Sequence, residues 1–119
     1  MRTFLKSVGH AWSGVVAGWS GRNFRIQTTI GILAIATGVA LRIARWEWCV
    51  VLTLTALVLS MELINTAIEK WVDHVSPEYS KTAGAVKDIA AGAVLVMSIF
   101  SATAGLIIFI PHLINLISL

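Results

Sequence analysis

Four polar side chains recur at helical spacing in the segment ELINTAIEKWVD, residues 62–73. They are Glu62, Asn65, Glu69 and Asp73, and at about 100° per residue they fall within roughly an 80° stripe of one helix. Carboxylates bind hard cations such as Mg²⁺, and a carboxylate can also accept a proton. The stripe therefore predicts metal binding, proton transfer or both.

The stripe follows directly on the apolar run 48–61, which is typical of a membrane helix, so the depth of each carboxylate in the membrane decides how the stripe is interpreted. A carboxylate near hydrocarbon costs at least about 2.5–3.5 kcal/mol, so such residues face a protein interior or an aqueous cavity and are functional candidates. Glu62 lies deepest and fits this description best. For Glu69 and Asp73 a second interpretation stays open, in which they only mark the solvated cytoplasmic end of the helix beside Lys70.

A second polar cluster follows shortly after the stripe. Ser76, Pro77 and Glu78 form a turn or helix-start signal, and Lys87 and Asp88 stand immediately before the next apolar run. A helix N-terminus presents free N–H groups and a partial positive charge, so this end and the lysine together suit a phosphate. The alternative interpretation is an ordinary charged flank of a membrane helix.

Together the two clusters indicate phosphoryl transfer. They provide carboxylates for a cation, a lysine for phosphate and a deeper carboxylate for a proton, and positioning with charge neutralisation carries most of the catalysis of this reaction. The sequence has no GxxxxGK[ST] loop, no glycine-rich kinase loop and no GxGxxG motif. Any nucleotide site must therefore be built in another way.

The composition indicates which elements position these residues. Of 119 residues, 57% are hydrophobic and 13% are charged, and the mean hydropathy is +0.84, whereas soluble domains carry about 25% charged residues. Apolar stretches at 26–41, 48–61 and 89–110 approach the roughly 20 residues that a membrane helix needs. We therefore predict an all-α membrane protein that forms a single domain.

The predicted domain has an N-terminal amphipathic surface helix and three transmembrane helices. Their expected ranges are residues 1–22, 23–42, 47–74 and 85–111, and Pro111 is expected to stop the last helix. In the N-terminal segment, apolar residues recur every three or four positions opposite polar ones, which is typical of a helix in the membrane interface. These apolar residues are Phe4, Leu5, Val8, Trp12, Val15, Val16 and Trp19.

The positions of Lys and Arg predict the orientation in the membrane. With three spans, the N-terminal segment and the connection before the third span share one side and hold most of the nine Lys and Arg residues. The positive-inside rule therefore places the N-terminus and the 70–88 region in the cytoplasm. The net charge of +3 is explained by topology and anionic lipid, and it requires no nucleic-acid partner.

One long run resembles the signature of the prokaryotic diacylglycerol kinase and undecaprenol kinase family, and it reads ELINTAIEKWVDHVSPEYSKTAGAVKDIAAGAVL. The family pattern is E-x-x-N-[ST]-x-I-E-x-x-x-D, then E-Y, then K-D-x-x-[AS]-A, and the match has no gap from Glu62 to Leu95. KSVGHAWSG resembles the family's amphipathic N-terminal helix. NFRIQ, with Asn23 and Arg25, resembles the R-N-x-R-I-H element of Gram-positive and cyanobacterial-type members.

The resemblance implies an integral membrane lipid kinase in the bacterial inner (plasma) membrane. It implies a homotrimer with active sites at the cytoplasmic surface between subunits, ATP as co-substrate, Mg²⁺ as cofactor and a membrane lipid alcohol as acceptor. By position, Glu62 is implied to be the general base that takes the proton from the lipid hydroxyl. Glu69 is implied to bind the Mg²⁺ that bridges the ATP phosphates, with Asn65 beside it.

The other signature residues are implied to surround the nucleotide. Lys87 contacts the phosphates, Asp88 helps to hold that arrangement, and Glu78 faces the nucleotide. Asp73 has a supporting role. Lys81 departs from the family, because better-known diacylglycerol kinases carry an acidic residue there.

A second departure concerns the metal. Family members usually have a further metal-ligand glutamate just before the R-N pair, where this chain has Gly21. Asn23 or a water molecule then has to replace it, or the chain is a poor enzyme.

The ending GLIIFIPHL and the NFRIQ element favour a lipid kinase with undecaprenol as acceptor. Two alternatives stay open. The first is diacylglycerol as the acceptor. The second, of another class, is a non-catalytic ion or proton conduit, since intramembrane carboxylates also mark relays. The polar residues on the aqueous side favour the kinase, because a proton path does not require them.

Overall fold

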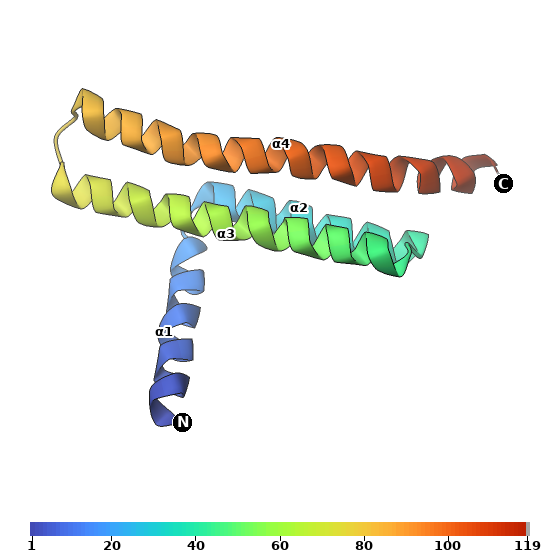
Figure 1. The fold of residues 1–119 in the computed structure, drawn as a ribbon, viewed down its shortest axis with the longest axis horizontal. Helices are drawn as coiled ribbons and strands as arrows, with labels where there is room; N and C mark the ends of the chain where they lie inside the picture. Colours follow the sequence, from blue (N-terminus) through green and yellow to red (C-terminus); the bar gives the residue numbers. More distant parts are fainter. Residues whose placement is uncertain (119) are drawn as a thin grey trace.

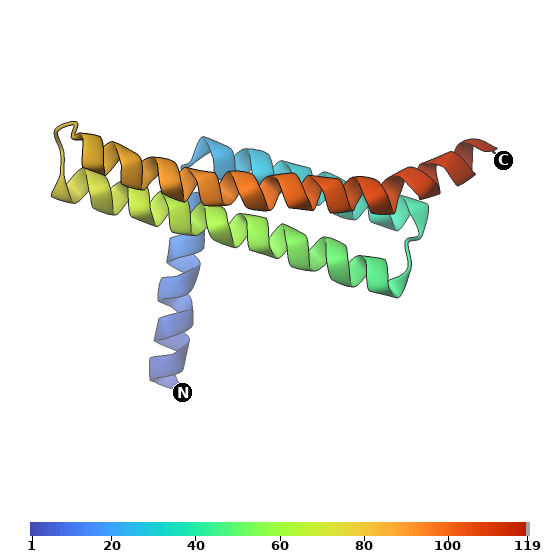
Figure 2. The same cartoon turned by 45° about the horizontal axis from the view of Figure 1, so that its top comes forward.

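The computed structural model describes residues 1–118, which form helices joined by short connections. The helices are α1 (Arg2–Gly18), α2 (Arg22–Leu41), α3 (Arg45–Val75) and α4 (Lys81–Ser118). Helices α2, α3 and α4 run alongside one another, and α1 leaves this bundle at a steep angle (Figure 1, Figure 2).

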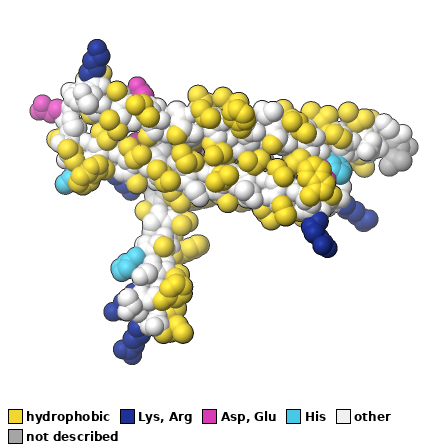
Figure 3. All heavy atoms as spheres, in the orientation of Figure 1, with side chains coloured by type: hydrophobic (Ala, Val, Ile, Leu, Met, Phe, Trp, Pro, Cys, Tyr) yellow, Lys and Arg dark blue, Asp and Glu magenta, His cyan; other side chains and the backbone are white. Residues whose placement is uncertain are grey.

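The three bundle helices are each long and apolar enough to cross a membrane. Hydrophobic side chains cover the visible outer face of the bundle, and the charged side chains gather towards its two ends (Figure 3). A helix satisfies its own backbone hydrogen bonds, so such a surface is stable in lipid. These features confirm the predicted all-α membrane protein.

Helix α1 meets the bundle at a glycine. A Cβ atom at Gly18 would clash with the Cδ2 methyl of Leu63 in α3, so a larger residue would force that side chain to move. Just beyond, the rings of Trp19 and Phe24 pack edge to face with centroids 6.3 Å apart. Hydrophobic side chains line one edge of α1 and basic ones the other (Figure 3), as an interfacial helix requires.

Glu47 fixes the end of the bundle that lies far from α1. Its Oε1 atom accepts a hydrogen bond from the Ala44 N–H at 2.9 Å, which caps the start of α3. The same oxygen lies 2.9 Å from His112 Nε2 in α4. Glu47 is only 7% exposed and neighbours the small core of Ile43, Val51 and Ile108. One carboxylate therefore ties α3 to the last part of α4.

We expect Glu47→Ala and His112→Ala to lower the thermal stability of the protein, each by a few degrees in Tm. Each change leaves a polar partner unpaired at a packed helix end, which is unfavourable. The double variant should lose much less than the sum of the two, because both changes remove the same contact. Thermal unfolding in detergent measures this coupling, and strict additivity would contradict it.

Helix α4 does not stop at Pro111, contrary to the sequence-based prediction, and it continues to Ser118. Proline lacks an N–H and its ring crowds the preceding turn, so it bends a helix but need not end it. The last part of α4 bends away from the helix axis (Figure 2). Apolar residues follow the proline, and His112 is held by Glu47, so helix remains the favoured conformation there.

Candidate active site

Glu62 and Asn65 are buried side chains on the face of α3 that meets the other bundle helices. Their exposed fractions are 3% and 6%. Both line a cavity of about 270 Å³, which we call the inner cavity. Its other lining residues, from α2 and α4, are Asn23, Ile26, Gln27, Ala91, Val94, Leu95 and Ser98. A carboxylate in such a wall is placed to exchange a proton with a bound molecule.

Asn65 links this cavity to Glu69, one turn further along α3. The Asn65 amide donates from Nδ2 to Glu69 Oε1 at 3.1 Å. Asn65 Oδ1 is buried and has no hydrogen-bond partner among residues 1–118. Leaving a buried acceptor unpaired is unfavourable, so this oxygen is available to a cation or a donor that enters the site.

The remaining signature residues line a second cavity, at the connection between α3 and α4. This outer cavity has a volume of about 390 Å³. It is lined by Asp73, Ser76, Pro77, Glu78, Tyr79, Ser80, Ala83, Gly84, Lys87 and Asp88. The structure thus brings Glu78 together with Asp88, although they are ten positions apart in the sequence.

Two contacts shape the outer cavity. Lys87 Nζ of α4 forms an ion pair with Asp73 Oδ1 of α3 at 2.5 Å, and both side chains stay more than a third exposed. The Ala83 N–H donates to Ser80 Oγ at 3.0 Å and so caps the first turn of α4. The ion pair is partly solvated, so an incoming phosphate can compete with Asp73 for the lysine.

The α3 stripe therefore connects the two cavities. Glu62 and Asn65 lie in the inner one, Glu69 is bonded to Asn65, and Asp73 lies in the outer one, where its side chain is 63% exposed. Buried groups stand at one end of the stripe and solvated groups at the other. A polar ligand in the outer cavity and an apolar one in the inner cavity would meet along it.

The two candidates from the start of α2 are placed differently. Asn23 lines the inner cavity although its residue is exposed overall. Arg25 is exposed and lines neither cavity in the described part of the chain. Arg25 therefore does not join the other site residues in the single chain.

The donors along the stripe fit Mg²⁺ rather than a fully protein-ligated metal. Among residues 1–118, no three His, Cys, Asp or Glu side chains are grouped closely enough to hold a metal ion. Mg²⁺ keeps several waters and binds through about one or two carboxylates plus substrate phosphates. Glu69 supplies one such carboxylate, and Asn65 Oδ1, which has no partner among residues 1–118, supplies a nearby neutral oxygen on the same helix face.

Gly21, the position of the absent glutamate, lies close to the stripe. It is the N-cap of α2, with an extended backbone (φ −81, ψ 129) that any residue can adopt. A Cβ atom there would lie 3.8 Å from Thr66 Oγ1, next to Asn65 in α3. The same Cβ atom would lie 3.3 Å from the Gly18 carbonyl oxygen, so a larger residue fits here only with a small shift of the backbone.

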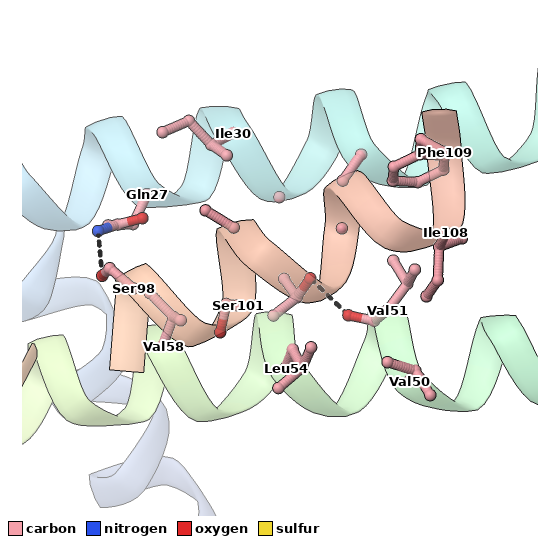
Figure 4. A pocket seen from close by; sticks show the side chains of 15 residues that line it. Gln27, Ile30, Val50, Val51, Leu54, Val58, Ser98, Ser101, Ile108 and Phe109 are labelled. Carbon is pink, nitrogen blue, oxygen red and sulfur yellow. Dashed lines mark hydrogen bonds between the residues drawn. The ribbon is translucent and has the colours of Figure 1, made fainter. Parts of the chain in front are cut away.

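A third cavity, of about 330 Å³, which we call the apolar cavity, continues from the inner one between α2, α3 and α4 (Figure 4). Its walls are mostly apolar: Ile30, Gly31, Ala34, Val50, Val51, Leu54, Thr55, Val58, Ser101, Ala102, Gly105, Ile108 and Phe109. Gln27 and Ser98 line both cavities and mark the border between them. Sequence reasoning missed this pair, and the only signal was a polar residue within each apolar run.

Comparison with known proteins gives one family. The sequence profile described as prokaryotic diacylglycerol kinase matches residues 9–109. The chain is 35% identical over 117 residues to an undecaprenol kinase of Bacillus subtilis, with 95% of this chain and 93% of that protein covered.

Two further relatives are named for diacylglycerol rather than undecaprenol. A diacylglycerol kinase of Synechocystis sp. is 37% identical over 114 residues, which cover 94% of this chain and 65% of that protein. A diacylglycerol kinase of Escherichia coli is 28% identical over 109 residues, covering 91% of this chain and 89% of the other.

Proposed function

The chain belongs to the prokaryotic diacylglycerol kinase family and is a lipid kinase, and from this premise we propose that it transfers the γ-phosphate of ATP to undecaprenol. The observation that carries the proposal is the position of Glu62. Its carboxylate is buried in the wall of the inner cavity, which continues into the apolar cavity on one side and approaches the outer cavity along α3 on the other. Family membership also decides against a conduit.

The apolar cavity supports a hydrocarbon chain as the body of the acceptor. Its walls are aliphatic or aromatic over most of their length, and the undecaprenol kinase of Bacillus subtilis is among the relatives with more than 90% coverage of both chains. A polyprenyl chain in this cavity would present its terminal hydroxyl to Glu62. Diacylglycerol, named in the other relatives, is the alternative acceptor.

In the proposed mechanism Glu62 accepts the proton of the lipid hydroxyl as that oxygen attacks the γ-phosphorus. The carboxylate is only 3% exposed, which limits the access of water that would compete for the proton. The lipid oxygen forms the new bond to phosphorus, and the bond to the β-phosphate oxygen breaks to release ADP. The products are a lipid phosphate, ADP and a proton that Glu62 later returns to solvent.

The residues at the polar end of the stripe bind and orient the nucleotide. Glu69 and Asn65 Oδ1 would hold Mg²⁺, which when bound neutralises charge on the ATP phosphates. Lys87 would contact the phosphates, and Asp73, which pairs with it in the free site, would keep the lysine side chain near them. Glu78 and Asp88 in the outer cavity wall would position the rest of the nucleotide.

The orientation and assembly follow the same proposal. The site lies at the end of the bundle that carries α1 and the α3–α4 connection, so the positive-inside rule supports a cytoplasmic site in the inner (plasma) membrane. A homotrimer would let a neighbouring subunit cover Glu69 and Glu78, which are exposed in the single chain. Native mass spectrometry from nanodiscs counts the chains, and a monomer would contradict the trimer.

The acceptor is tested by competition. Nanodiscs that contain undecaprenol and diacylglycerol at equal mole fractions receive MgATP with a radiolabelled γ-phosphate. We expect most of the label in undecaprenyl phosphate. Label mainly in phosphatidic acid would mean that the protein is a lipid kinase whose main acceptor is diacylglycerol. Label in neither lipid, from protein shown to be folded, would contradict the kinase activity.

A further inference from the structure

Polar side chains gather at the end of the apolar cavity that lies nearest Glu62. Gln27 of α2 donates from Nε2 to Ser98 Oγ of α4 at 3.0 Å, and this bond crosses between the helices at the border of the inner and apolar cavities (Figure 4). A ligand that enters the apolar cavity from the inner one passes this pair. Its first atoms beyond the hydroxyl therefore meet hydrogen-bonding groups rather than hydrocarbon.

Ser101 adds an unsatisfied hydroxyl one turn further along α4. Its Oγ is buried, lines the apolar cavity and has no hydrogen-bond partner among residues 1–118. Other hydroxyls of the bundle behave differently, since Thr55 and Thr103 each donate to the carbonyl four residues earlier at 2.8 Å. A buried hydroxyl without such a bond is unfavourable, and a ligand that supplies a hydrogen-bond acceptor removes this cost.

The order of these groups matches one class of lipid alcohol. From Glu62 the groups follow as a carboxylate, then the Gln27 and Ser98 pair, then Ser101, which lies about 4.5 Å further along the helix axis. Diacylglycerol has two ester carbonyls within a few bonds of its hydroxyl, and both accept hydrogen bonds. A polyprenol has only hydrocarbon at these positions.

We propose that Gln27, Ser98 and Ser101 are specificity-determining residues that bind the ester carbonyls of diacylglycerol while its hydroxyl faces Glu62. The inference rests on the proposed lipid kinase and deepens it. Undecaprenol, the main acceptor, has no carbonyl group. It therefore lies past Gln27 and Ser98 without accepting a hydrogen bond, and these two side chains stay bonded to each other. Diacylglycerol is then a second acceptor whose use depends on these three side chains.

The test removes the carbonyl from the lipid and the donor from the protein in turn. The lipids are dioctanoylglycerol, an ester, and dioctylglycerol, its ether analogue without carbonyls, and kcat/KM is measured for each in nanodiscs. We expect the wild-type protein to prefer the ester by about fivefold or more, as the loss of one or two hydrogen bonds implies. In Ser101→Ala and Gln27→Leu the ratio should fall towards one.

Thr103→Ala is the matched control, because its hydroxyl lies on the same helix, is exposed and bonds only within the helix. It should keep the wild-type ratio. A wild-type ratio near one, an unchanged ratio in both cavity variants, or no use of the ester by a protein that phosphorylates undecaprenol would each overturn the inference and leave the kinase intact.

A binding measurement keeps the inference testable without turnover. The infrared band of a ¹³C-labelled ester carbonyl shifts when the carbonyl accepts a hydrogen bond, so dioctanoylglycerol bound to the wild-type protein should show a shifted band that Ser101→Ala loses. The same band in both proteins would overturn the inference. If the shift is present and no lipid is phosphorylated, the carbonyl site stands and the proposed kinase fails.

Discussion

Replacement of Glu62 by glutamine is expected to lower kcat for lipid phosphorylation by a factor of about 10²–10⁴. Glutamine has nearly the same shape and keeps the packing of a side chain that is 3% exposed, but it cannot accept the proton of the lipid hydroxyl. The affinity for MgATP should stay close to that of the wild type, because the proposed nucleotide site lies along the outer part of the stripe, away from Glu62. Steady-state kinetics and equilibrium ATP binding in the same nanodiscs measure both quantities.

Glu47→Gln is the matched control for this result. Glu47 is also a buried glutamate of α3, 7% exposed, but it stands 15 residues earlier, about 22 Å along the helix. Glutamine there can still accept the Ala44 N–H, so the variant should fold and keep its turnover. A Glu62→Gln protein that turns over like the Glu47→Gln protein would remove Glu62 from its assigned role.

The second large effect is expected for Glu69→Gln, which should weaken the Mg²⁺-dependent part of ATP binding by at least about tenfold. Even partners in the outer shell of a metal site cost about 10–100-fold in metal affinity when they are removed, and Glu69 would supply the charged oxygen itself. Asn65 then keeps its amide bond to residue 69 but faces an uncharged partner. Titration of ATP binding against Mg²⁺ measures the change.

Binding of ATP in the presence of a chelator provides the control for Glu69→Gln. Without Mg²⁺ the wild-type and variant proteins should bind ATP with similar, weak affinity, because the lysine contact is unchanged. A loss that is equal with and without Mg²⁺ would mean that Glu69 acts on the fold or on the nucleotide directly. That result would contradict its role as a metal ligand.

The helical stripe is the part of the site that could be predicted from the sequence. Spacing of three and four residues fixes which side chains share a helix face, and in the structure Asn65 and Glu69 are indeed hydrogen-bonded on that face. The grouping of Glu78 with Lys87 and Asp88 follows from the short α3–α4 connection. Local rules are sufficient for contacts of this kind.

Contacts between distant helices could not be predicted in the same way. Gln27 and Ser98 are 71 residues apart, and Glu47 and His112 are 65 apart, and periodicity within a helix does not say which face of another helix it meets. Arg25, which its motif position places among the candidate site residues, is exposed on α2 and lines neither site cavity in the described single chain, so its role stays a prediction. Pro111 shows that a proline does not end a helix where apolar residues follow it and the contact between His112 and Glu47 holds the next turn in place.

A single-turnover experiment tests whether Glu62 is the base for lipid phosphorylation. Wild-type and Glu62→Gln proteins in undecaprenol nanodiscs are first saturated with MgATP that carries a radiolabelled γ-phosphate, and transfer is then followed by rapid quenching. We expect equal amounts of bound nucleotide in the two proteins and transfer to lipid that is at least about 100-fold slower in the variant. Equal transfer rates from equal bound nucleotide would contradict this role of Glu62.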